Sequence, residues 1–187
     1  MRSTISRRVF RGVAGAAVTG LVLATASACS VPPDAVAGVS VTEDGHLLGV
    51  IQVCGHHIDG AVLYYDEEAD DLLDDVVGTK SVTVNSWTAD RPLEPGLFTW
   101  PLESPAAGWT AEHATTPLSA EITYTFFGGT EDSSWSAQSV EFTLADRDRL
   151  TPGMVRYFNA NGPTGDEPTV TVPMAEFKAG ACATLRP

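Results

Sequence analysis

The stretch that decides the fold spans residues 44–65 and reads DGHLLGVIQVCGHHIDGAVLYY. It contains two apolar runs rich in β-branched residues, 47–53 and 61–65, on either side of a turn built from Gly, His and Asp. Such runs are typical of strands that are buried well enough to lose strict alternation. The sequence therefore predicts a buried hairpin at the centre of the core, with Cys54 at its turn.

The hairpin is preceded by one more expected strand. Val39 and Val41 alternate with polar residues, and Asp44-Gly45 is a strong signal for a two-residue turn into the next strand. Beyond the hairpin, strand-like segments are separated by clusters of Gly, Pro and Asp. These segments are 81–85, 97–100, 121–126, 140–144, 154–158 and 169–172.

About nine short strands with polar turns predict an all-β fold, an antiparallel two-sheet sandwich of immunoglobulin-like architecture. The signature of a true immunoglobulin domain is absent, because Gly180 stands two residues before Cys182 where that family has Tyr. We expect the architecture without the family membership.

A single helical pattern occurs, in residues 66–77. Apolar residues recur at i, i+3, i+4 and i+7 from Ala69, and seven of the ten residues from 66 to 75 are acidic. The segment predicts one short acidic helix. It fails the calcium-loop template twice, since Asp71 replaces the required glycine and Val77 the required glutamate.

The chain is strongly acidic. It carries 11 basic and 24 acidic residues, and four of the basic ones are the arginines at positions 2, 7, 8 and 11. From residue 29 onward the net charge is therefore about −17. Such a surface repels nucleic-acid phosphates, so no nucleic-acid partner is expected.

The first 29 residues carry the pattern of an export leader. Ser6-Arg7-Arg8-Val9-Phe10 precedes a weakly apolar segment, 12–28, that is rich in Ala and Gly and too short for a stable membrane span. This pattern resembles the twin-arginine export signal, and Ala26-Ser27-Ala28-Cys29 resembles a bacterial lipobox with Ala in the usual Leu position. The resemblance is to exported lipoproteins of high-GC Gram-positive type, and it covers the leader only.

This resemblance implies three parts: a cleaved signal peptide (1–28), a lipid-anchored tether (29–38) and a β-sandwich domain (39–187). Acylated Cys29 would hold the protein on the outer face of the cytoplasmic membrane. Ordinary signal cleavage at the same small residues is the alternative, and it would release a soluble form with a free Cys29.

The other two cysteines, Cys54 and Cys182, are left as a pair in an oxidising compartment, where a disulfide is expected. The twin-arginine route exports folded proteins, so we expect this bond to reinforce the fold without being required for it. Two unrelated buried thiols are the alternative.

Cys54, His56 and His57 are close enough in sequence to suggest copper or zinc. A disulfide-bonded Cys54 cannot be a ligand, however, and the other histidines have no ligand spacing. We therefore interpret His56 and His57 as polar turn residues and candidate binding residues, and we expect no metal and no cofactor.

Trp109 and Trp135 lie in polar surroundings rich in Pro, Gly and Ser. Clustered at one end of the domain they would form a stacking platform for a sugar or a peptide, whereas scattered they would fill the core or the sheet edges. They complete the set of candidate binding residues.

Signatures of nucleophilic catalysis and of phosphate-binding loops are absent from the sequence. The prediction is an exported binding or interaction module, favoured over an enzyme, with a cell-wall or protein ligand. A wall-directed hydrolase and an extracytoplasmic metal-binding protein are the alternatives.

Overall fold

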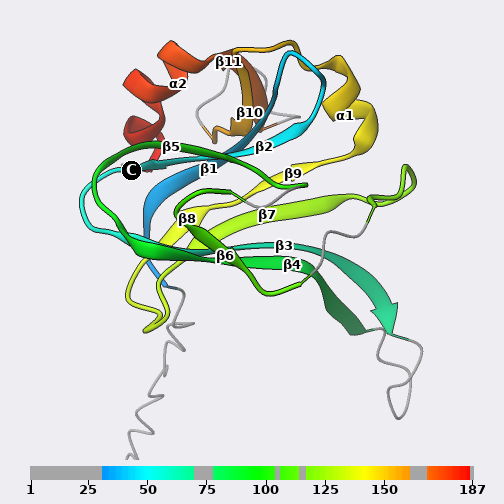
Figure 1. The fold of residues 1–187 in the computed structure, drawn as a ribbon, viewed down its shortest axis with the longest axis horizontal. Coiled ribbons are helices and arrows are strands. Elements are labelled where there is room, and N and C mark those ends of the chain that lie inside the picture. The colour runs from blue at the N-terminus through cyan, green and yellow to red at the C-terminus, as the bar shows by residue number, and fades with distance from the viewer. Residues whose placement is uncertain (1–30, 70–77, 104–105, 114–116, 161–167, 186–187) are drawn as a thin grey trace, which may run out of the picture. The chain divides into compact units, whose positions relative to one another are not determined.

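The computed structural model describes residues 31–69, 78–103, 106–113, 117–160 and 168–185, which lie in one compact unit, Val31–Pro187 (Figure 1). Its elements in chain order are β1 (Pro33–Val41), β2 (Leu47–Val53), β3 (Ile58–Ala69), β4 (Gly78–Leu93), β5 (Gly96–Pro101), β6 (Trp109–Ala111), β7 (Tyr124–Gly129), β8 (Ser136–Gln138), β9 (Val140–Phe142), α1 (Leu144–Arg149), β10 (Met154–Phe158), β11 (Thr169–Pro173), α2 (Met174–Gly180) and the 3₁₀ helix η1 (Ala181–Leu185).

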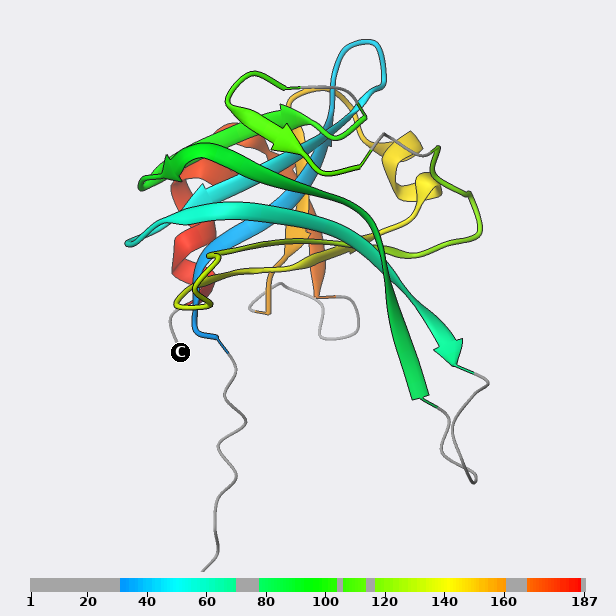
Figure 2. The same ribbon diagram turned by 60° about the horizontal axis from the view of Figure 1, so that its bottom comes forward.

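All of these strands belong to one hydrogen-bonded sheet that curls on itself (Figure 2). Its main path is β11-β10-β1-β8-β7-β3-β4-β6, while β2 connects β1 to β5 and β9 pairs with β7. The sheet is mixed, because β1 and β8 run parallel. The prediction of a mainly β protein is confirmed, whereas the purely antiparallel, two-sheet immunoglobulin-like sandwich is not confirmed.

Strand β1 connects the parts of this sheet. One edge pairs with β2 over residues 35–41, and the opposite edge is shared between β8 and β10. Ala35, Ala37 and Val39 are buried in the larger hydrophobic core, while Val36 is buried in the smaller one. Because β1 is apolar on both faces, it lies between the two cores and contributes residues to each.

This burial corrects the predicted tether. Residues 33–38, expected to be part of it, form most of β1, and Ala35, Val36 and Ala37 are fully buried. Pro32-Pro33 suggested a stiff linker, but a proline is tolerated at the first residue of a strand. Because small apolar residues occupy both faces of β1, apolar and polar residues do not alternate along it. A search for alternation therefore does not predict this strand.

The pairing of β2 also differs from expectation. The turn that joins β1 to β2 does contain Asp44-Gly45, but it is not the predicted two-residue turn. Thr42 pairs with His46 and the Gly45 N–H donates to the Thr42 carbonyl at 3.0 Å, so the loop has three residues and ends at Gly45 with its positive φ of 81°. The predicted core hairpin is wrong, however: β2 pairs with β1 and β5, whereas β3 pairs with β4 and β7. The two runs therefore form consecutive strands, β2 and β3, that are not paired with each other.

The predicted acidic helix is wrong over residues 66–69, which belong to β3, and residues 70–77 lie outside the described part of the chain. Asp66 lies opposite Ser81 on β4, and the Ser81 hydroxyl donates to its carboxylate at 2.6 Å. Glu67 lies opposite Lys80. Cross-strand pairs of this kind stabilise an acidic strand, and the helical spacing alone did not reveal them.

The helices lie elsewhere. Helix α1 begins at a capping box in which Thr143 and Asp146 bond to each other's backbone N–H groups. Helix α2 buries Phe177 in the smaller core, and η1 follows directly. Within the described residues, none of these helices combines the length and apolarity needed to cross a bilayer.

The curled sheet is closed by tryptophans. Trp100 on β5 and Trp109 on β6 belong to strands far apart in the sheet order, yet their rings stack with centroids 4.0 Å apart. Trp100 is also tilted against Phe126 in the larger core. Aromatic stacking, without a hydrogen-bonded ladder, therefore brings the two strands together.

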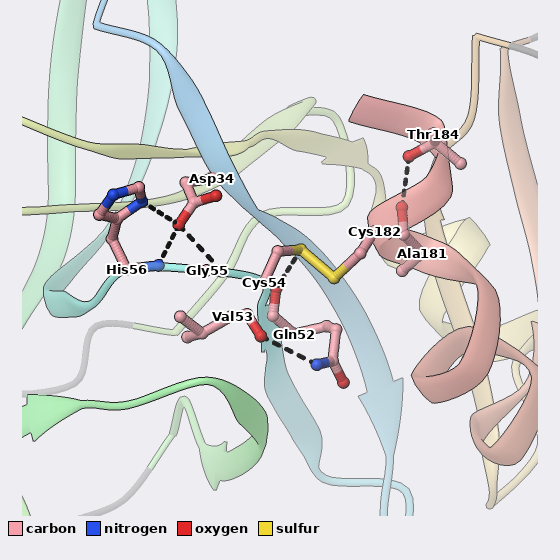
Figure 3. Close-up of a disulfide and its surroundings, with 9 residues drawn as sticks. All are labelled: Asp34, Gln52, Val53, Cys54, Gly55, His56, Ala181, Cys182 and Thr184. Carbon is pink, nitrogen blue, oxygen red and sulfur yellow. Dashed lines mark hydrogen bonds and ion pairs between the residues drawn. A yellow bond between two sulfur atoms is a disulfide. The ribbon is translucent and has the colours of Figure 1, made fainter. Parts of the chain in front are cut away.

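Cys54, just after β2, forms the predicted disulfide with Cys182 in η1, at an S–S distance of 2.03 Å (Figure 3). The bond joins residues 128 positions apart in sequence. It fastens the C-terminal helices over the smaller core, in which Phe177 and Ala181 pack against Val36 and Val50.

We expect removal of this disulfide by the double change Cys54→Ser and Cys182→Ser to lower the free energy of unfolding by about 2–4 kcal/mol, because a long loop is then no longer closed in the unfolded chain. Denaturant titration followed by circular dichroism measures this loss. The β spectrum should persist without denaturant; an unfolded spectrum would show that the bond is required for folding.

A second prediction concerns Asp146, whose carboxylate joins α1 to β10. Burial raises its pKa, but hydrogen bonds from Thr143 and the guanidinium groups of Arg149 and Arg156 outweigh that effect, so the pKa lies below its ordinary value. The folded state thus favours the ionised form. Its stabilisation is complete above about pH 4 and is lost as the pH falls through the lowered pKa.

Asp146→Asn should therefore reduce the free energy of unfolding by about 1–2 kcal/mol at pH 7 and by less below pH 4. Urea titrations across this range test it. Asp148→Asn is the control, because the Asp148 side chain is 65% exposed. An equal loss at every pH would contradict the interpretation.

Candidate functional site

A broad groove lies over strands β3, β4 and β7, with walls from the end of β6 and from the turn between β7 and β8. Its volume is 1020 Å³. Small-molecule pockets usually measure about 300–1,000 Å³, so this groove is large enough for an extended ligand.

The floor of the groove is the outer face of the sheet. Successive residues of a strand point to opposite faces, and Ala61 and Leu63 of β3 are buried in the larger core. Val62, between them, therefore points outward. Phe127, its partner on β7, is likewise only partly buried and lines the groove.

Two glycines leave part of this floor bare. Gly60 on β3 is paired with Gly129 on β7. A Cβ on Gly60 would come no closer than 3.6 Å to a neighbour, so packing does not require glycine there. At Gly129 a Cβ would lie 3.2 Å from the ring of Phe127. Gly60 also follows an irregularity in the pairing of β3 with β4, between Ile58 and Gly60. Glycine in a strand often marks such a bulge, or a site where a ligand or another backbone approaches closely, and the open face of Gly60 leaves room for the latter.

Carboxylates stand on opposite sides of the floor. Asp59 accepts a hydrogen bond from the backbone N–H of Glu131 at 2.9 Å on the β7 side. On the β6 side, Ser86 donates its hydroxyl proton to Glu112 at 2.5 Å. His113 follows Glu112, and its backbone N–H donates to the Asn85 side chain at 3.2 Å. Within the described residues, no Lys or Arg lines this groove.

The turn between β2 and β3 carries a second cluster (Figure 3). The Asp34 carboxylate of β1 accepts hydrogen bonds from the backbone N–H groups of Gly55 and His56, and His56 Nδ1 lies 2.9 Å from the same oxygen. The His56 ring stacks on Trp135, with centroids 3.6 Å apart. Asp34 thus holds the β2–β3 turn against β1, and Trp135 holds it against the β7–β8 turn.

His57, the next residue, lies close enough to Asp132 of the β7–β8 turn for an electrostatic interaction. Hydrogen bonds from Ser134, first of all from its hydroxyl, lower the pKa of Asp132, and Thr130 and His57 lower it further. The carboxylate of Asp132 is therefore held ionised within its own turn. This turn forms one wall of the groove through Thr130 and Glu131.

The structure brings only part of the predicted site together. His56 and Trp135 are in contact, whereas Trp109 stacks on Trp100 as a partly buried closing residue of the core. Trp109 and Trp135 therefore do not form a stacking pair. Cys54 is in the disulfide, and the described residues contain no group of three or more His, Cys, Asp or Glu side chains suited to a metal.

Sequence reasoning missed the groove itself. The Gly, Pro and Asp clusters that divide the predicted strands include Gly128-Gly129, yet both residues belong to the end of β7. The groove combines segments centred on positions 60, 86, 112 and 130, and their proximity depends on the sheet order. The one local signal was Gly60, which lies directly before the predicted apolar run 61–65.

No family model, curated protein or solved structure matches the chain. A function must therefore be inferred from its own residues.

We expect Asp34→Ala to lower the free energy of unfolding by about 1–3 kcal/mol, because it leaves the N–H groups of Gly55 and His56 without their acceptor. It should also change the tryptophan emission, since the His56 ring would no longer be held against Trp135. Asp44→Ala, at an exposed turn residue, is the control. Unchanged stability and emission would contradict a structural role for Asp34.

Proposed function

We propose that this protein is an exported lipoprotein, anchored by acylated Cys29 on the outer face of the cytoplasmic membrane, whose β domain binds a ligand in the groove over β3, β4 and β7. The twin-arginine pattern and the lipobox support export and anchoring. The predicted ligand is a cell-wall component or another protein.

The observation that carries the binding role is the bare floor at Gly60. The groove is built on β3 and its two hydrogen-bonded partners, β4 and β7, so its floor is set by strand pairing before a ligand arrives. Binding sites on such rigid elements lose little conformational entropy when they are occupied. Outward Val62 and Phe127 supply apolar contact, and the surrounding hydroxyl and carboxylate groups supply hydrogen bonds.

The hydrolase alternative has one observation in its favour, because Ser86, Glu112 and His113 line the same groove. A serine relay needs the imidazole between the hydroxyl and the carboxylate. Here the Ser86 hydroxyl donates directly to Glu112, and the bond recorded for His113 comes from its backbone. Because the imidazole does not stand between the hydroxyl and the carboxylate, this arrangement favours binding over catalysis.

The metal-carrier alternative requires a reduced Cys54. That sulfur is bonded to Cys182, which removes it from the set of available ligands in this form of the protein.

Native mass spectrometry of the protein taken from its own membranes tests the proposal. We expect a chain that starts at acylated Cys29 and retains a non-covalent companion. Gly60→Val should lose the companion with little change in melting temperature, because the added side chain fills the groove without meeting the core.

Thr171→Val is the matched control, since it places valine at an exposed strand position on β11, outside the groove. A companion that persists in Gly60→Val would contradict the groove as binding site, and an unmodified N-terminus would contradict the anchor.

A further inference from the structure

The charges of the groove indicate the class of its ligand. We infer that it binds an extended, cationic polypeptide segment with two basic side chains about four residues apart. This inference rests on the proposed binding role of the groove and adds the chemistry of the ligand.

The first step concerns charge. Asp59, Glu112 and Glu131 line the groove, whereas none of its lining residues within the described chain is Lys or Arg. Carboxylates of this kind are ionised at neutral pH. An anionic ligand would be repelled at close range, whereas a cationic one would be attracted.

Within the described residues, none of the ion pairs formed by arginine involves these carboxylates. Arg147, Arg149 and Arg156 form ion pairs with Asp146, Asp148 and Glu103, around α1 and β10. The partners of Asp59 and Glu112 are instead neutral donors, the N–H of Glu131 and the hydroxyl of Ser86. These contacts do not pair either carboxylate with a cation, and carboxylate oxygens can accept further hydrogen bonds.

The second step concerns spacing. Asp59 and Glu131 stand at one end of the groove, and Glu112 stands beyond β4 at the other. Glu131 follows β7 and Glu112 follows β6, which are three strand spacings apart in the order β7-β3-β4-β6, so at about 4.8 Å per spacing the two ends lie on the order of 15 Å apart. Four residues of an extended chain cover about 13–14 Å. Basic side chains at i and i+4 therefore match the two ends.

The third step concerns the floor. Between the two ends lies the bare backbone at Gly60 and Gly129, which lets a second backbone approach closely. Val62 and Phe127 are available beside it for the aliphatic part of a lysine side chain. A polypeptide fits this combination of a close approach in the middle and charges at the ends.

The test uses the full chain in detergent and a fluorescein-labelled peptide, Ser-Lys-Ser-Thr-Ser-Lys-Ser, with its lysines at i and i+4. Fluorescence anisotropy should show binding that weakens as salt is added, because part of the attraction is electrostatic. Gly60→Val should abolish it. The triple variant Asp59→Asn, Glu112→Gln and Glu131→Gln should weaken it about tenfold or more, since three charge contacts are lost while the internal hydrogen-bond acceptors remain.

The control is a second triple variant, Glu43→Gln, Glu94→Gln and Glu121→Gln, which removes the same charge at exposed positions outside the groove. Its affinity should change less than about twofold, because distant surface charges are screened. Equal weakening in both triple variants would overturn the inference, because the peptide would then sense only the overall acidity.

A neutral N-acetylglucosamine hexamer, tested in the same assay by competition and by direct calorimetry, separates the inference from the proposed function. Binding of the hexamer but not of the peptide, with loss in Gly60→Val, would overturn the cationic ligand and leave the groove as a binding site. If neither probe bound, both the cationic ligand and the groove as a binding site would be overturned.

Discussion

The structure depends on the burial of β1 on both faces. A Cβ at Gly38 would lie 2.6 Å from the Val155 side chain and 3.0 Å from the backbone oxygen of Arg156, so β10 can pack there only against glycine. The neighbouring residues of β1 are small and fully buried. Since each face belongs to a different core, the two cores cannot form independently, and the order of the strands around β1 fixes the rest of the sheet.

The same strand determines where the functional elements stand. Its Asp34 holds the turn after β2, its parallel partner β8 holds the turn after β7, and that turn forms one wall of the groove. The groove floor is thereby attached to a rigid scaffold through two turns. The groove carboxylates are not part of the hydrophobic cores, so the proposed binding chemistry can change without loss of the fold.

Much of the fold could be predicted where local pattern decides it. Alternation located β9, β11 and the first half of β7, the Asp44-Gly45 signal located the β1–β2 hairpin, and cysteine arithmetic located the disulfide. Prediction failed where tertiary contacts decide. Small residues buried on both faces made β1 look like a tether, and cross-strand partners turned residues 66–69 into a strand.

The candidate site was less predictable than the fold, because it depends on long-range pairing. His56 and Trp135 were selected from their residue types and do meet, but nothing local indicated that Asp34 would hold them. The groove residues come from four separate segments. Residue-resolved hydrogen–deuterium exchange tests the role of β1 most directly: its amides at residues 35–40 should exchange only by global unfolding, whereas rapid exchange there, as in an exposed tether, would contradict the account.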